Sequence, residues 1–92
     1  MKVHELLSTR DRWTQGALAR RSSTLQTATH DPEAVCWCLA GAIVRCYHKP
    51  EEYWPIIKKV TEELAIPAIA AWNDRQGRTW KEVIELAQRL DI

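Results

Sequence analysis

The chain has 92 residues, of which 46% are hydrophobic and 27% charged, and its formal net charge is +1. This balance predicts one globular domain over residues 1–92, and it argues against a disordered tail, a dedicated nucleic-acid binder or a membrane-surface protein. No stretch approaches the roughly 18 apolar residues of a membrane-spanning helix, no signal segment is recognised, and an odd number of cysteines suits a reducing compartment, so we expect a cytoplasmic protein.

The first 30 residues divide into two parts. Val3, Leu6 and Leu7 lie on one side of a short predicted helix. The sequence WTQGALARRSSTLQTATH that follows is rich in Thr, Ser and Ala and has no helical stripe. We therefore predict an extended or hairpin segment within residues 13–30.

The stretch DPEAVCWCLAGAI predicts the central element of the fold. Asp31 can cap a helix, Pro32 is tolerated at its first position, and Glu33 suits the positive end of the helix dipole. No charged residue lies between Glu33 and Arg45, and apolar residues occur on every side of the helical projection. A helix that is apolar all round is a buried one. We predict a buried central helix over residues 31–47 with the other helices packed around it.

Two further helices are predicted in the C-terminal half. Proline disfavours a helix interior, so Pro55 predicts a turn over residues 51–53 and a helix over residues 54–65. Thr79 and Glu82 have the spacing of a capping box, which predicts a last helix from there. The run AIAAW between these helices is either one helical turn or a short strand. The predicted fold class is mainly α, with about four helices, and a small α+β fold is the alternative.

The cysteines are the first candidates for chemistry. On a helix, Cys36 and Cys38 would point about 200° apart and could not hold one metal ion together. The chain also lacks the ligand spacing of a zinc site, so we expect no metal and no cofactor. A Cys36 thiol in the second turn of the helix could be a nucleophile with His30 or His48 as its base. Burial in the core is the interpretation we favour, and we assign no catalytic residue.

The segment AAWNDRQGRT is the second candidate. It combines an aromatic ring, an amide, a carboxylate and two guanidinium groups that could contact a ligand or a partner protein: Trp72, Asn73, Asp74, Arg75 and Arg78. The structural alternative is a turn in which Asp74 pairs with Arg78 and Thr79 caps the next helix.

Basic residues near the N-terminus are the third candidate. Residues 1–30 hold five basic against two acidic side chains, whereas residues 31–92 hold eight against ten. Arginines interleaved with Trp13 are typical of a phosphate or nucleic-acid contact, and here they are Arg10, Arg12, Arg20 and Arg21. The overall charge favours a simple solvated surface instead.

Three short motifs together resemble a family of small uncharacterised proteins of bacteria and their phages. The motifs are Trp-Thr-x-Gly, Cys-x-x-Gly-Ala, and Trp-Asn-Asp followed by Gly-Arg-Thr. The matching positions are Trp13, Thr14 and Gly16; Cys38, Gly41 and Ala42; Trp72, Asn73 and Asp74; and Gly77, Arg78 and Thr79. The resemblance implies a stand-alone domain carried by a phage or another mobile element, and it implies no activity.

The sequence as a whole favours a small, tryptophan-rich, non-enzymatic binding or accessory protein that acts through protein–protein contacts. A homodimer is an alternative assembly, because an all-apolar helix needs extensive cover. The alternative functions are a thiol-dependent hydrolase that uses Cys36 with a histidine, and a nucleic-acid contact through residues 10–21.

Overall fold

The computed structural model describes residues 1–92, and 52% of them are helical. Its elements in chain order are α1 (Val3–Leu6), the 3₁₀ turn η1 (Arg10–Arg12), β1 (Ala19–Arg20), β2 (Gln26–Thr27), β3 (Cys36–Trp37), α2 (Leu39–Tyr47), α3 (Pro50–Leu64), α4 (Ile69–Asp74) and α5 (Trp80–Leu90). The mainly helical prediction is confirmed, and the small sheet makes the fold an α+β one.

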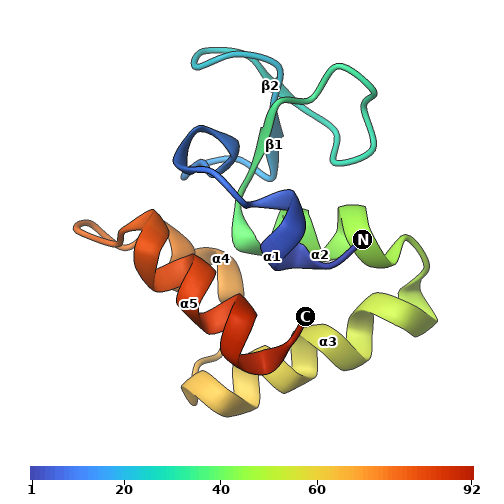
Figure 1. The fold of residues 1–92 in the computed structure, drawn as a ribbon, viewed down its shortest axis with the longest axis vertical. Coiled ribbons are helices and arrows are strands. Elements are labelled where there is room, and N and C mark those ends of the chain that lie inside the picture. The colour runs from blue at the N-terminus through green and yellow to red at the C-terminus, as the bar shows by residue number, and fades with distance from the viewer.

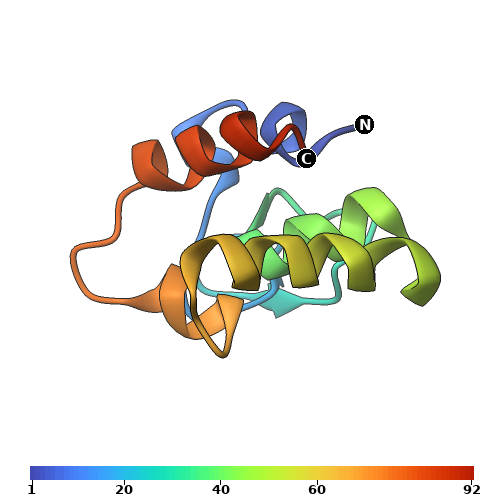
Figure 2. The ribbon, with the colours of Figure 1, turned by 90° about the horizontal axis from the view of Figure 1, so that it is seen from below.

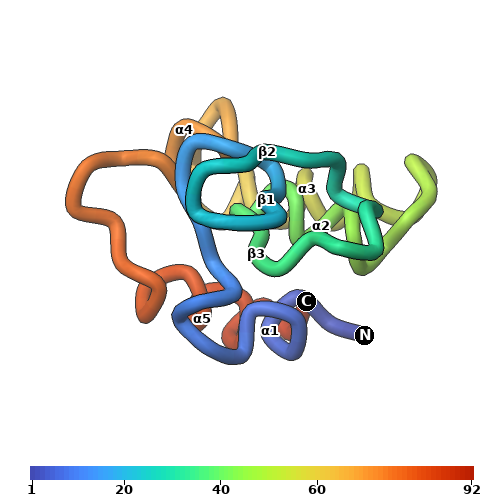
Figure 3. The backbone as a smooth tube through the Cα atoms, turned by 90° about the horizontal axis from the view of Figure 1, so that it is seen from above, coloured from blue at the N-terminus to red at the C-terminus, as the bar shows by residue number.

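The strands form a small antiparallel sheet at one end of the molecule (Figure 1). β1 pairs with both β2 and β3, so the strand order is β2-β1-β3. The β1–β2 hairpin is the extended segment predicted within residues 13–30. Trp13 adds a parallel bridge to Trp37 on the free side of β3. Figure 3 shows the strands in front of α2, and Figure 1 shows α3 on the far side of α2, so the sheet covers one side of α2.

The prediction of a helix over residues 31–47 is wrong in its first half. Residues Cys36–Trp37 form β3, and α2 begins only at Leu39. β3 is extended because it pairs with β1, in the register Ala19 with Trp37. That pairing is a long-range contact which local helix-start signals do not reveal.

Asp31 caps a turn rather than a helix. Its carboxylate accepts a hydrogen bond from the Glu33 backbone N–H at 3.0 Å and others from the Thr27 hydroxyl and the Arg21 guanidinium. These donors hold the pKa of Asp31 well below its usual range, the Arg21 contact most strongly. The Asp-Pro-Glu signal therefore marks a hydrogen-bonded turn that leads into β3.

α2 is nevertheless the buried centre of the domain, as predicted, because none of its residues is exposed. Cys38 is its N-cap, and the Cys38 Sγ accepts a hydrogen bond from the Gly41 N–H at 3.3 Å. A Cβ at Gly41 would lie 1.9 Å from the carbonyl oxygen of Leu18. The backbone before β1 therefore crosses α2 at a point where only glycine fits.

α3 also departs from the prediction, because it begins at Pro50 and contains Pro55. Pro50 occupies the first turn, where a proline loses no hydrogen bond, and Glu51 and Glu52 suit the positive end of the dipole. Pro55 removes one bond to the carbonyl of Glu51, and both residues are exposed, so water can reach that oxygen. One lost bond on the solvent side does not break the helix.

The helices form two layers, with α1 and α5 in one and α2, α3 and α4 in the other (Figure 2). The two chain ends lie side by side. The Val3 N–H donates to the Ile92 carbonyl at 2.7 Å, and Lys2 forms an ion pair with Asp91 at 2.7 Å. The run AIAAW contributes to α4, the helical alternative. None of the helices has the length and apolar character that crossing a membrane requires.

Candidate functional site

Asn73, from the second candidate segment, lies at a junction of three parts of the chain. It is fully buried at the end of α4. Its side-chain oxygen accepts hydrogen bonds from the Trp13 indole N–H at 2.7 Å and from the Leu39 N–H at 3.0 Å. Its amide nitrogen donates to the Thr14 carbonyl at 3.1 Å and to the Asp74 carboxylate at 2.9 Å. Both polar atoms are used inside the fold, so none is left for a ligand.

Asp74 and Gln15 complete this junction. The Gly16 N–H donates to the Asp74 carboxylate at 2.9 Å, and the Gln15 amide donates to the carbonyls of Asn73 and Arg75 at 2.9 and 3.2 Å. The Trp-Thr-x-Gly and Trp-Asn-Asp segments therefore bind each other. We call this cluster, made of residues 13–16, Leu39 and residues 73–74, the Asn73 junction.

The predicted pairing of Asp74 with Arg78 is wrong. Arg78 lies over the Trp72 ring at 4.0 Å from its centroid, donates to the Trp72 carbonyl at 2.9 Å, and pairs with Glu82 at 2.7 Å. Glu82 is the capping-box acid of α5, and the hydrogen bond from Arg78 lowers its pKa. Of the five candidates in this segment, only Arg75 and Asp74 are exposed, and Asp74 already accepts two hydrogen bonds.

The thiols are distributed differently from the helical prediction. Cys36 is buried in β3, so the helix-dipole argument for a lowered thiol pKa no longer applies to it. Burial raises the pKa of the Cys38 thiol. Cys46, on α2, is half-buried, and burial raises the pKa of its thiol to about 11. Neither the Cys38 nor the Cys46 environment favours the thiolate that a nucleophile needs.

His30 and His48 stack on each other, with ring centroids 5.0 Å apart and planes 12° apart. Burial lowers the pKa of His30, and the neighbouring His48 and Arg45 lower it further. Because a second positive charge is disfavoured here, the pair favours a neutral His30. The sequence named both histidines but did not indicate that they meet.

The four arginines named from the sequence do not form one surface. Arg20 is held by the Thr14 hydroxyl at 3.0 Å and the Gln15 carbonyl at 3.0 Å. Arg21 pairs with Glu33 at 3.0 Å as well as with Asp31. Arg10 and Arg12, both on η1, are exposed and have no ion-pair partner within 4.0 Å.

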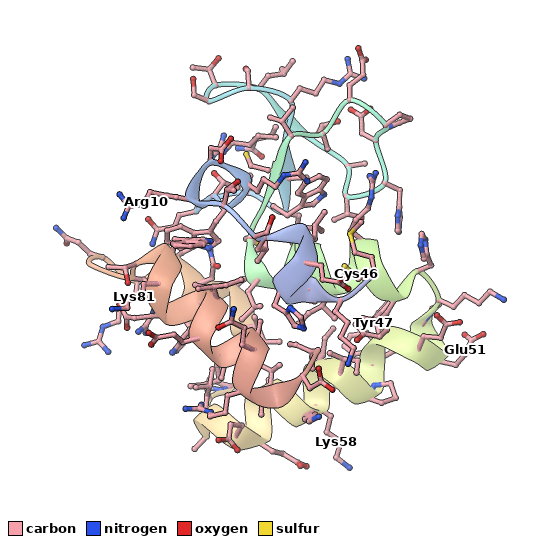
Figure 4. All side chains as sticks on the ribbon, viewed as in Figure 1. Arg10, Cys46, Tyr47, Glu51, Lys58 and Lys81 are labelled. Carbon is pink, nitrogen blue, oxygen red and sulfur yellow. The ribbon has the colours of Figure 1, made fainter.

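A pocket of about 340 Å³ is enclosed by α1, η1, β3 and the C-terminal end of α2. We call it the α1–α2 pocket. Figure 4 shows Cys46 on α2 beside α1, where the pocket lies, and Arg10 on the other side of α1. The lining residues are Met1, Leu6, Arg12, Ala34, Trp37, Arg45, Cys46 and His48.

Sequence reasoning did not identify Arg45 and Cys46 as site residues. A usable signal existed, because Arg45 is the only Lys, Arg, Asp or Glu between Glu33 and Lys49. A single arginine on an otherwise uncharged buried helix needs a specific partner or an opening to solvent. In this structure it has both.

These features define a small α+β domain with a buried glycine-containing helix and one partly enclosed cationic pocket. At the Asn73 junction, all four hydrogen bonds of the amide go to protein atoms. The chain belongs to a family of unknown function, DUF6197, whose pattern matches residues 1–90. Family membership confirms the predicted resemblance to a family of unknown function. No curated protein and no solved structure matches the chain.

Proposed function

We propose that the protein is a small accessory protein that acts by binding another protein, and that α3 carries the contact. Its association with a phage or another mobile element, implied by the sequence resemblance, is part of the proposal. The observation that carries the proposal is the position of Trp54 at the start of α3. This side chain is 58% exposed, whereas Trp37 is buried and Trp13, Trp72 and Trp80 are half-buried.

An exposed tryptophan is a strong candidate for an interface anchor. Trp is enriched among the residues that dominate binding energy, because it buries a large area at low entropic cost. Tyr53 packs beside it, with ring centroids 5.4 Å apart, and Glu51 and Glu52 are exposed next to both. The partner surface that complements this group is an apolar pocket flanked by basic side chains.

Capture of partners by matched variants tests this proposal. Tagged wild type, Trp54→Ala and Val35→Ala are used to capture proteins from an extract of the native host, with quantitative mass spectrometry. Val35 is 52% exposed and directly precedes β3, whereas Trp54 lies on α3, so Val35→Ala is the control. We expect one partner that both wild type and Val35→Ala retain and that Trp54→Ala loses at least about tenfold. Equal capture by Trp54→Ala, or no partner above an unrelated tagged protein, contradicts the proposal.

A second copy of the chain is the simplest alternative partner. Sedimentation of the purified protein over a range of concentrations measures self-association, and a dimer that Trp54→Ala dissociates would identify that partner as the protein itself. The thiol hydrolase and the nucleic-acid contact have direct tests of their own. A single fast-reacting thiol with a lowered pKa favours the enzyme, and a salt-sensitive gel shift favours the nucleic acid.

A further inference from the structure

We propose that the α1–α2 pocket binds a small organic anion, with the apolar body of the ligand inside the pocket and its anionic group on Arg12 and Arg45. This site is separate from Trp54 and does not depend on the proposed protein partner. The ligand class is an aromatic or other flat apolar molecule that carries one carboxylate or phosphate.

The walls of the pocket suit such a molecule. Its volume of about 340 Å³ lies within the usual range of about 300–1,000 Å³ for small-molecule sites. Leu6, Trp37 and Cys46 supply apolar surface, and the polar lining consists of Arg12, Arg45 and His48. An apolar wall with a few convergent polar groups is the usual composition of a ligand site.

The charged side chains that line the pocket are both cationic, and neither forms an ion pair within the protein. No carboxylate lies within 4.0 Å of the cationic nitrogen atoms of Arg12 or Arg45, whereas five other Lys and Arg side chains form such pairs: Lys2, Arg21, Lys58, Arg78 and Arg89. No acidic residue lines the pocket. Two guanidinium groups beside an apolar cavity can bind a carboxylate or phosphate through charge-assisted hydrogen bonds.

The nearby acids are already occupied. Glu5 on α1 accepts a hydrogen bond from the Lys2 N–H at 2.8 Å. Asp11 on η1 accepts one from the Thr9 hydroxyl, and the Asp31 carboxylate is held by Arg21. None of these carboxylates lies within 4.0 Å of the cationic nitrogen atoms of Arg12 or Arg45, so none fills the place of an anion.

Arg45 is positioned before any ligand arrives. Its Nη1 donates to the carbonyls of Thr29 and Asp31 at 2.9 and 3.1 Å, and its guanidinium lies 5.3 Å from the centroid of the Trp37 ring. Fixing one edge of the guanidinium reduces the side-chain entropy that a ligand would otherwise have to overcome. The remaining N–H groups, on Nε and Nη2, donate to no protein atom and are the donors we expect a ligand to use.

A titration with three probes tests the site on the intact protein. The probes are 2-naphthoate, the uncharged 2-naphthalenemethanol and inorganic phosphate, and the readout is the amide and indole N–H spectrum of nitrogen-15-labelled protein. The indole N–H of Trp37 donates to the Thr29 carbonyl at 3.0 Å, so its signal reports on the wall of the pocket. We expect 2-naphthoate to shift the Trp37, Ala34 and Cys46 signals saturably, and each of the other two probes to bind at least about tenfold more weakly.

The variants separate this pocket from general surface binding. Arg12→Gln removes an exposed charge that has no hydrogen-bonded partner and lines the pocket. Arg10→Gln removes the other arginine charge on η1, and Arg10 does not line the pocket. Arg12→Gln should weaken 2-naphthoate about tenfold, and Arg10→Gln should leave its affinity within about twofold. Ala34→Leu narrows the pocket without removing a charge, and it should also weaken the binding of 2-naphthoate.

Four results would overturn the proposal. The first is that 2-naphthoate and 2-naphthalenemethanol bind with equal affinity, and the second is that inorganic phosphate binds as tightly as 2-naphthoate. The third is that Arg12→Gln binds 2-naphthoate with unchanged affinity. The fourth is that the signal shifts do not saturate or are confined to residues outside the pocket. The second result would identify a plain phosphate site, and the first an apolar site without charge recognition.

Discussion

The Asn73 junction and the α1–α2 pocket are built from similar residues but differ in how their polar groups are used. Both place polar side chains beside a tryptophan and an end of α2. At the junction, all four hydrogen bonds of the Asn73 amide go to protein atoms, and no buried side-chain polar atom of the chain lacks a partner. In the pocket, Arg12 has no partner and Arg45 uses only one nitrogen.

This difference separates structure from recognition. A buried polar group that lacks a partner costs about 1–3 kcal/mol, so a saturated cluster is strongly held and has little capacity left for a ligand. A half-exposed guanidinium costs little when it is unpaired, because water solvates it, and it stays available. The Trp-Asn-Asp motif, which had the most distinctive residues in the sequence, therefore serves to hold the fold together.

The largest expected effect is on the junction. Asn73→Ala removes four hydrogen bonds and leaves the Leu39 N–H buried without an acceptor, so we expect a loss of about 4 kcal/mol in the free energy of unfolding. Urea unfolding followed by far-ultraviolet circular dichroism measures this loss. Gln76→Ala, an exposed substitution in the turn after α4, is the control and should change stability by less than about 0.5 kcal/mol. If Asn73→Ala lost as little stability as Gln76→Ala, the Asn73 junction would not stabilise the fold.

The second prediction concerns the thiol in the pocket. With its pKa at about 11 instead of the ordinary 9.0, Cys46 has a thiolate fraction about a hundredfold lower than a free thiol at pH 8. Its reaction with a thiol reagent, located by peptide mass spectrometry, should be slow and should rise about tenfold per pH unit from pH 7 to 10. A rapid reaction that levels off below pH 8 would instead favour a nucleophilic cysteine.

The third prediction compares the stability that the Asn73 junction provides with that of a local contact, the N-cap of α5. Thr79 caps α5 by accepting from the Glu82 N–H at 3.3 Å, and both residues are exposed. Thr79→Ala should cost about 1 kcal/mol, and Thr79→Ser, which keeps the hydroxyl, should recover most of it. Equal losses for the two substitutions would assign the effect to packing rather than capping.

The smallest effect is expected in the pocket itself. Arg12→Gln should change the free energy of unfolding by less than about 0.5 kcal/mol, because Arg12 is exposed and has no ion-pair partner. The same urea titration checks it. A loss above about 1 kcal/mol would mean that Arg12 supports the fold and would remove the contrast between the two regions.

Local signals predicted the parts of the structure that depend on neighbours in sequence. The capping box of Thr79 and Glu82 fixed the start of α5, and the uncharged stretch before Arg45 indicated the buried helix. The hairpin within residues 13–30 followed from the absence of a helical stripe. The site was predicted less well, because Asn73 was chosen for its chemistry and proved to be a fold contact, while Arg45 and Cys46 were not chosen.

The sequence by itself determined the class of the fold, its buried centre and its family, because periodicity, capping and motif spacing are local properties. Only the tertiary structure decided that residues 36–37 are a strand, that Gly41 faces the Leu18 carbonyl, and that Asn73 bridges Trp13 and Leu39. These contacts join positions that are distant in the chain. Their energy comes from strand pairing and from hydrogen bonds in a buried site, and both exist only once the chain has folded around α2.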